Sequence, residues 1–277
     1  MREQAQKRGT KIVYKMKNNI ILLLTVLGLA ATACVFEEDN TSSVGGEVVF
    51  YATNGDSPSS KTVLLSDGTI QWKPADKISL FYGSSSFEFT STNASNASEA
   101  EFHGTLDGIE YTENGEFWAV YPYNNATTFD GGTVTVTLPE EQRAVPGSFD
   151  DDLFISIAKT RDYNLQFYNV CGGVRFTVTQ PDVKYVTFKG NKNEPIAGKA
   201  TVKWDNYGKP VIHSVVSPKS TITVTAPDGG SFEVGEWYYI VCFPATLSSG
   251  YTLTMNTQLN AFTSKTGANA VTIKRSV

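Results

Sequence analysis

Short stretches of strand-forming residues, separated by turn residues, recur along almost the whole chain after residue 46. Within each stretch apolar or aromatic residues alternate with polar ones, as in "EVVFYAT" (47–53) and "GVRFTVTQ" (173–180). The intervening segments are clusters of Gly, Asn, Asp, Ser and Pro, which favour turns. Almost nothing has the period of an amphipathic helix. Strands at a spacing of about ten residues, without helices between them, predict an all-β sandwich or barrel.

The predicted strands fall into two series that meet at Pro181, whose fixed φ and missing N–H interrupt a strand ladder. We therefore expect two tandem β-sandwich domains, residues 47–180 and 182–277, the second of which is short or truncated. The first series comprises 47–53, 69–72, 77–83, 87–92, 116–122, 132–139 and 173–180, and the second comprises 183–190, 198–204, 220–227, 237–244, 250–257 and 270–277.

The apolar run from Ile20 to Ala31 follows a basic flank and is shorter than the roughly 20 residues that a membrane-spanning helix needs. This order is typical of a secretory signal peptide, which we assign to residues 1–33. Cys34 comes directly after "ATA", as in a bacterial lipoprotein box, and we expect it to be acylated and to become the mature N-terminus. Each buried methylene of an acyl chain adds about 0.8 kcal/mol to membrane binding. Plain secretion and a buried cysteine at the end of a hydrophobic helix are the alternatives, and translation starts at Met1 or Met16.

Residues 34–46 are predicted to be a flexible tether. Its acidic residues, Glu37, Glu38 and Asp39, resemble the export tag that sends lipoproteins of Bacteroidetes to the outer face of the outer membrane. We therefore expect a lipid-anchored, surface-exposed protein of the outer membrane. A merely solvated tether is the other interpretation of these acids.

The charge of the chain argues against nucleic acid as a partner. Residues 1–33 hold six of the 23 basic residues and one of the 28 acidic ones. The mature chain is left with 17 basic and 27 acidic residues, a formal charge of −10. Phosphate backbones and anionic lipids both require clusters of Lys and Arg, so binding to either is not expected.

Few residues are suited to catalysis or metal binding. The chain has two histidines, His103 and His213, and none of the paired His or Cys motifs that hold zinc. No Gly-x-Ser-x-Gly nucleophile elbow is present. We expect no enzyme activity and no cofactor. The run of Asp150, Asp151 and Asp152 is a weak candidate for Ca²⁺, which prefers carboxylate oxygens, although such runs are more often solvated loops.

Aromatic residues make up 12% of the chain and suit packed sheets. Trp72, Trp118 and Trp237 lie within predicted strands and are expected to fill cores. Trp204 ends the predicted strand 198–204 before the turn "DNYG", and is therefore the best candidate for stacking on a glycan. Among the cysteines, Cys171 and Cys242 are predicted to be buried free thiols in different domains.

Several motifs, taken together and in order, resemble the fimbrillin or Mfa-like proteins of Bacteroidales. In the first half they are "TIQWKPADKISLFYG" (69–83), "AEFHGTL" (100–106), "WAVYPYNN" (118–125), "VTLPEEQ" (136–142) and "NLQFYNVCGGVRFTV" (164–178). In the second half they are "NEPIAGKATV" (193–202) and "EWYYIVCFPATLSSGYTL" (236–253). The motifs cover nearly the whole mature chain.

The resemblance implies two transthyretin-like β-sandwiches, no catalysis, and a role in adhesion or fimbrial assembly with other fimbrial subunits or a surface receptor as partners. In that family a protease removes an N-terminal strand after an arginine, and a terminal strand of another subunit fills the groove by β-augmentation. The corresponding strand here contains Val48, Val49, Phe50 and Tyr51. At the other end Val271 and Ile273 lie in a strand that is able to pair elsewhere.

This chain departs from the family pattern because no arginine lies between Cys34 and Arg143. Without a cleavage point ahead of the first strand, an anchor, accessory or stand-alone adhesin is favoured over a polymerising shaft subunit. The alternative function is a surface glycan-binding lipoprotein of a polysaccharide uptake system.

Overall fold

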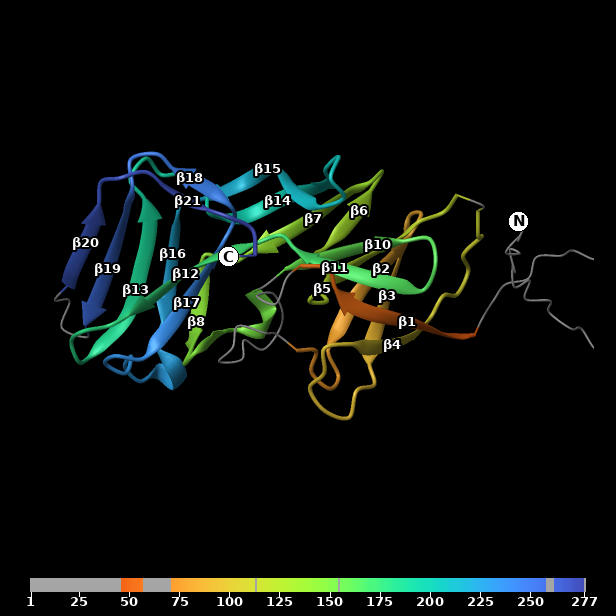
Figure 1. Cartoon of the computed structure of the whole chain (residues 1–277), viewed down its shortest axis with the longest axis horizontal. Coiled ribbons are helices and arrows are strands. Elements are labelled where there is room, and N and C mark those ends of the chain that lie inside the picture. Colours follow the sequence, from red (N-terminus) through yellow and green to blue (C-terminus); the bar gives the residue numbers. More distant parts are fainter. Residues whose placement is uncertain (1–45, 57–70, 113, 154, 258–261, 277) are drawn as a thin grey trace, which may run out of the picture. The chain divides into compact units, whose positions relative to one another are not determined.

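The computed structural model of the protein describes residues 46–56, 71–112, 114–153, 155–257 and 262–276. In these residues the chain forms 21 strands, and helix is confined to two single 3-10 turns, η1 (Asp151–Leu153) and η2 (Pro227–Gly229). The predicted all-β, sandwich-like fold is confirmed (Figure 1). No helix in the described ranges is long and apolar enough to cross a membrane.

Seven strands between residues 47 and 169 form a sheet that closes on itself as a barrel, in the order β1-β11-β10-β5-β2-β3-β4. They are β1 (Glu47–Asn54), β2 (Lys77–Tyr82), β3 (Ser85–Ser91), β4 (Ala100–Thr105), β5 (Phe117–Tyr121), β10 (Ser156–Thr160) and β11 (Asn164–Asn169). Neighbouring strands are antiparallel except β1 and β11, which are parallel. Closure leaves the barrel without an unpaired edge.

Aromatic rings fill the barrel. Trp72 is completely buried and makes edge-to-face contacts with Phe102, Tyr121 and Phe167, at centroid distances of 5.2, 5.2 and 5.3 Å. Edge-to-face geometry is the arrangement that ring quadrupoles favour. The prediction that Trp72 fills a core is confirmed.

The remaining strands form four smaller sheets. A six-stranded sheet has the order β20-β19-β13-β16-β8-β9, and a four-stranded sheet has the order β15-β14-β7-β6. Two pairs, β12-β17 and β18-β21, complete the fold. The bounds are β6 (Thr128–Asp130), β7 (Thr133–Leu138), β8 (Glu141–Val145), β9 (Ser148–Phe149), β12 (Gly172–Thr177), β13 (Val183–Gly190), β14 (Ala197–Trp204), β15 (Pro210–Lys219), β16 (Thr221–Thr225), β17 (Trp237–Cys242), β18 (Ala245–Leu247), β19 (Tyr251–Thr257), β20 (Phe262–Gly267) and β21 (Val271–Ile273).

Strand pairing crosses the boundary that we predicted between residues 180 and 182. Strand β7 pairs with β14, β8 pairs with β16, and β12 pairs with β17, so strands on both sides of Pro181 share sheets. The proposed split into 47–180 and 182–277 is therefore corrected. Pro181 lies in the turn between β12 and β13, but the hydrogen-bond partners of β7, β8 and β12 lie later in the chain.

Strand β5 shows why the barrel and the other sheets are joined. Its five residues are all buried, against the alternation expected of a strand with one wet face. Phe117 and Tyr121 belong to the core inside the barrel, whereas Trp118 and Val120 belong to the core shared with the other sheets. Both faces of this strand are therefore packed against apolar side chains.

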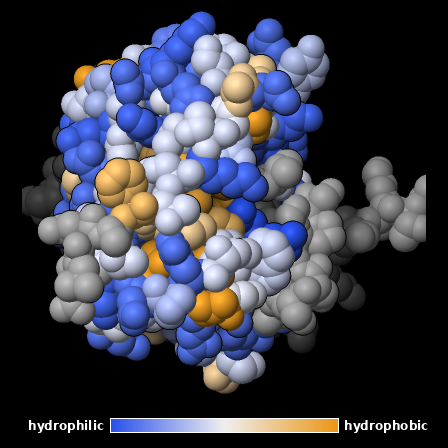
Figure 2. All heavy atoms as spheres, turned by 90° about the vertical axis from the view of Figure 1, so that its left-hand side faces the viewer, coloured by the Kyte–Doolittle hydropathy of each residue, from blue (hydrophilic) through white to orange (hydrophobic). Residues whose placement is uncertain are grey.

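The two large open sheets have contrasting edges. Strand β15 pairs with β14 through two register shifts and ends close to Pro218, features that discourage pairing with another chain. Strand β20 pairs with β19 in continuous register and exposes 69% of Phe262. On the side of β19 and β20, hydrophobic residues form small groups among polar ones (Figure 2). Scattered groups of this kind are ordinary on a protein surface.

Candidate functional site

Strand β1, which holds four of the predicted strand-exchange residues, is built into the barrel between β4 and β11 (Figure 1). Its residues 47–52 pair with β4, and residues 51–54 pair with β11. Phe50 is completely buried and makes edge-to-face contacts with Phe89 and Phe117, at 5.4 and 5.0 Å. Tyr51, its neighbour, points outward and is 49% exposed. Loss of β1 would therefore open the barrel and uncover its aromatic core.

Strand β21, which holds Val271 and Ile273, is much less firmly paired. The predicted strand 270–277 is shortened to three residues, and these pair with β18 alone among the described strands. Ile273 is 5% exposed and belongs to the shared core, whereas Val271 is 37% exposed. One deeply inserted side chain and one short ladder hold this strand.

The residues after β21 are fastened to the end of β1 by a set of polar contacts that we call the tail clasp: Asp56, Asn169, Arg275 and Ser276. Nη1 of Arg275 lies 2.8 and 2.6 Å from the two carboxylate oxygens of Asp56. The Asp56 carboxylate also accepts hydrogen bonds of 2.8 Å from the Ser276 hydroxyl and from the Asn169 backbone N–H. The Asp56 side chain is only 7% exposed. Charge-assisted hydrogen bonds to a buried carboxylate are among the stronger polar interactions in proteins.

A glycine lets the tail lie close to β12. The backbone N–H of Ser276 donates a hydrogen bond to the Cys171 carbonyl, at 3.0 Å. A Cβ atom at Gly172 would overlap the carbonyl oxygen of Lys274. The clasp carries no sequence signal, because Asp56 and Arg275 lie 219 positions apart and neither belongs to a recognisable motif.

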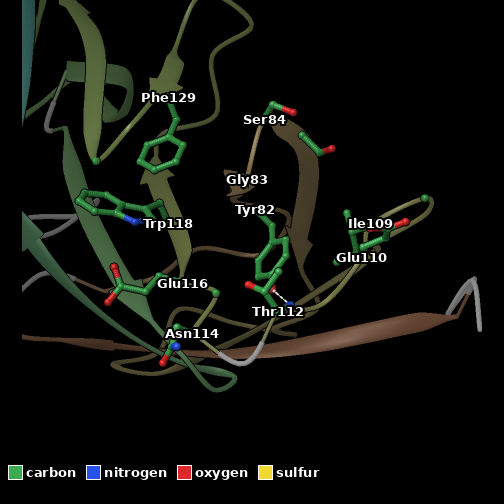
Figure 3. Close-up of a pocket in the computed structure, with 14 residues that line it drawn as sticks. Tyr82, Gly83, Ser84, Ile109, Glu110, Thr112, Asn114, Glu116, Trp118 and Phe129 are labelled. Carbon is green, nitrogen blue, oxygen red and sulfur yellow. Dashed lines mark hydrogen bonds between the residues drawn. The ribbon is translucent and has the colours of Figure 1, made fainter.

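A pocket of about 510 Å³ lies beside the barrel, with walls from β2, β5, β6 and the segment before β5 (Figure 3). Phe129 and Trp118 lie on one side, with ring centroids 5.0 Å apart, and Tyr82 lies on the other. Glu116 and Asn114 supply polar groups at its border. No sequence pattern predicted this site, since the lining residues are widely spaced, and the motifs that contain Tyr82 and Trp118 indicated the family resemblance rather than a pocket.

The segment before β5 is held in place by Tyr82. The Tyr82 hydroxyl accepts a 2.8 Å hydrogen bond from the backbone N–H of Thr112. A Cβ atom at Gly115 would overlap the same hydroxyl group, so the backbone passes directly over the ring edge. The ring of Tyr82 packs on Phe117 in the barrel, at 4.7 Å. This wall of the pocket is therefore formed before any ligand arrives.

The tryptophans differ from the prediction in two respects. Trp204, the predicted glycan-stacking residue, is partly buried and packs edge-to-face against Trp118, at 5.6 Å, with Lys159 Nζ 5.7 Å from its ring centroid. Trp237, expected in a core, is 43% exposed and lies under the Arg175 guanidinium, 4.1 Å from its centroid. The alternation of β17 places Trp237 on the outer face. Trp118 is 5% exposed, and its expected burial is confirmed.

The acidic run is engaged in ion pairs. Asp151 pairs with Lys73, and an oxygen of Asp150 lies 3.2 Å from Nε of Arg143. Asp152 follows in η1. In the described residues no group of three or more His, Cys, Asp or Glu side chains is arranged to hold a metal ion.

Cys171 and Cys242 are completely buried free thiols. They do not lie in separate domains as predicted, because Cys242 is opposite Gly172 in the β12-β17 ladder. Burial raises the pKa of the Cys171 thiol to about 12, since the thiolate would lose its hydration. Cys34 and the acids Glu37, Glu38 and Asp39 lie outside the described residues.

No protein-family model matches the chain. No curated protein matches it either. Among solved structures, a candidate cell adhesion protein from Bacteroides uniformis is similar at 18% identity and a TM-score of 0.46, covering 79% of this chain and 84% of that one. A second candidate cell adhesion protein, from Bacteroides ovatus, has 14% identity and a TM-score of 0.46, covering 82% and 89%. The tip fimbrial protein Mfa3 from Porphyromonas gingivalis, with a C-terminal truncation, has 9% identity and a TM-score of 0.38, covering 79% and 80%.

Proposed function

We propose that this protein is a cell-surface adhesion subunit of a fimbria-like assembly, anchored in the outer membrane through a lipid on Cys34 and joined to a partner subunit by strand donation. In this proposal β1 is retained and β21 is the donated strand. The observation that carries the proposal is the difference between the two strands: β1 has a partner on both sides, whereas β21 has a three-residue ladder with β18.

The anchoring half of the proposal is supported by the sequence. An apolar run too short to span a bilayer, a basic flank before it and Cys34 after small residues are the parts of a lipoprotein signal. The absence of any arginine between Cys34 and Arg143 favours retention of β1, since the family's proteolytic step follows an arginine.

The donation half is supported by side-chain alternation in β21. Val271 and Ile273 lie on one face of the strand, and Ile273 already occupies an apolar site in this subunit. A donated strand gains affinity from main-chain hydrogen bonds, and alternate side chains that enter pockets set its register. The same two residues would serve as the register-setting pair in a partner.

The clasp is proposed to control donation. While Asp56 holds Arg275 and Ser276, the tail stays on the subunit that made it. A partner must replace those contacts before β21 can leave. Asp56 follows β1 by two residues, so any disturbance of β1 also weakens the grip on the tail.

The anchor is tested by mass analysis of the mature N-terminus from native cells. An acylated Cys34 is expected, and Cys34→Ser is expected to move the protein from the envelope to the soluble fraction. A free N-terminus beyond residue 53 would instead mean that β1 is removed, and retention of Cys34→Ser in the envelope would contradict lipid anchoring.

Donation is tested by comparing Ile273→Asp with Thr272→Asp in native cells. Both variants add one charge to β21, but Ile273 is buried and Thr272 is exposed. Cross-linked assemblies that contain this protein should be lost in Ile273→Asp and kept in Thr272→Asp. Equal assembly in both variants, with both folded, would rule out β21 as the donated strand.

A further inference from the structure

The pocket beside the barrel is a second candidate site, separate from the strands proposed to exchange. Its volume of about 510 Å³ falls within the range of roughly 300–1,000 Å³ that is typical of small-molecule sites. It combines three aromatic residues with carboxylate, amide and hydroxyl groups (Figure 3). A cavity with apolar walls and a few polar groups at its border recognises an amphipathic small molecule.

The apolar wall is made by Phe129 and Trp118. Phe129 is partly buried and its ring is tilted by 36° to that of Trp118, so the two rings form a bent platform rather than a closed stack. Phe81 packs on Phe129 at 5.9 Å and fixes its position. The face of Phe129 toward the pocket is left for a ligand (Figure 3).

The polar border is fixed by charges outside the pocket. Oε1 of Glu116 lies 3.4 Å from Nε of Arg161, and its Oε2 lies 3.7 Å from Nζ of Lys159. Nζ of Lys159 also lies 5.5 Å from the centroid of the Trp118 ring, since Lys159 of β10 is opposite Trp118 of β5 in the antiparallel ladder. The Glu116 carboxylate is thereby held beside the aromatic platform, and it keeps lone pairs that can accept hydrogen bonds from ligand hydroxyl groups.

The charge of the lining selects among ligands. Among the residues that the structure describes, the lining of the pocket holds Glu110 and Glu116 and no Lys, Arg or His. Carboxylates in the lining repel an acidic ligand. The Glu116 carboxylate is already paired with Arg161 and Lys159, and this pairing reduces the attraction of the carboxylate for a cationic ligand. The class of ligand that fits this lining is a neutral molecule with an apolar face and an edge of hydroxyl groups.

We propose that this pocket binds a neutral saccharide of one or two pyranose units. The C–H face of a sugar ring lies against Phe129, and its hydroxyl groups donate hydrogen bonds to Glu116 and to the side-chain oxygen of Asn114. The pre-formed wall at Tyr82 and Gly115 lowers the ordering cost of binding. This site does not depend on strand donation, so either proposal can fail without the other.

The proposal is tested with the soluble Cys34→Ser protein by saturation-transfer NMR and by tryptophan fluorescence. The probes are cellobiose, maltose, lactose and xylobiose as neutral sugars, 3′-sialyllactose as an acidic sugar and tetramethylammonium as a cation. We expect saturable binding of at least one neutral disaccharide and none of the acidic sugar. Binding of no neutral disaccharide, or tighter binding of tetramethylammonium, would overturn the proposal.

Variants locate the site. Phe129→Ala and Asn114→Ala should each weaken binding of the neutral sugar, by about tenfold or more for Phe129→Ala. Trp237→Ala, which removes an exposed tryptophan outside the pocket, should leave affinity unchanged. Because Asn114 is exposed, we expect Asn114→Ala to fold even if Phe129→Ala does not. Affinity that is unchanged in Asn114→Ala, or reduced in Trp237→Ala, would place any sugar elsewhere.

Discussion

Strands β1 and β21 both carry alternating apolar side chains, but β1 is held in the fold far more firmly than β21. Strand β1 has eight residues, a partner on each side and Phe50 at the centre of an aromatic core. Strand β21 has three residues, pairs with β18, and is held beyond its end by the tail clasp. Alternation of apolar side chains alone therefore does not say how firmly a strand is held, because that depends on how many strands and side chains surround it.

The comparison also separates two kinds of attachment. Burial of apolar area, which holds β1, scales with the surface removed from water and is lost only when the barrel opens. The tail depends on Ile273 and on polar contacts to Asp56. Polar contacts of this kind can be exchanged for equivalent ones in a partner, so the tail is suited to reversible release.

The largest effect is expected from Phe50→Ala, which removes a fully buried ring from the barrel. Truncation of a buried Phe typically costs about 3–5 kcal/mol of the free energy of unfolding. Tyr51→Ala removes an outward ring from the same strand and should cost about 1 kcal/mol or less. Chemical denaturation measures both. Equal losses would show that β1 is not held by its inward face.

Asp56→Ala should come next, because it leaves the Asn169 N–H without its acceptor and removes the carboxylate partner of the Arg275 guanidinium, which keeps the Asn169 carbonyl and the Ser276 hydroxyl as acceptors. Leaving such groups unsatisfied costs about 1–3 kcal/mol each. Hydrogen exchange should show faster exchange across residues 271–276 with little change in β1. Arg161→Met, which removes a 64% exposed ion-pair partner of Glu116, is the matched control and should change stability by less than about 1 kcal/mol. Faster exchange throughout the barrel would show that the tail and β1 open together.

Gly172→Ala should act on the tail through sterics. The added Cβ overlaps the Lys274 carbonyl, and such overpacking typically costs about 1–3 kcal/mol. We expect residues 274–276 to exchange faster while the Asp56 contacts weaken indirectly. Unchanged exchange in the tail would mean that β12 can move away at little cost.

Near neutral pH the smallest effect is that of the Cys171 thiol, which changes stability only at higher pH. Because the folded pKa of this thiol is raised to about 12, the unfolded chain, with a thiol pKa of about 8.5, ionises first. The free energy of unfolding should therefore fall as the pH rises from 8.5 towards 12, by at most about 1.4 kcal/mol per unit from this group. Cys171→Ala should reduce that slope in the Cys34→Ser background. An identical slope in both proteins would show that the thiol is accessible in the folded state.

Sequence patterns located much of the fold but not its connections. The alternation in 47–53 matches β1, and the run at 77–83 matches β2 within one residue. Strand β5 is buried on both faces, so its sequence is a continuous apolar run. Such a run does not show that the two faces pack in different cores. Strands β6, β9 and β18 have only two or three residues, too few for a pattern to be detected.

The candidate sites were the least predictable part. Arg275 follows Lys274 in the short segment after β21, and its partner Asp56 follows β1; no local rule pairs residues so distant. Trp204 looked exposed because a turn follows it, but Trp118 covers one side of its ring. In both cases the deciding contact comes from a segment remote in the chain.

What the amino-acid order determined by itself is the all-β character, because side-chain alternation and turn residues act within a few positions. Tertiary contacts alone fix which strands share a sheet, where the tail is fastened and which rings border the pocket. These contacts join surfaces of complementary shape that are far apart in the sequence, so the chain between them must close into a long loop. The free energy of such contacts depends on matching shapes and charges that no single segment contains.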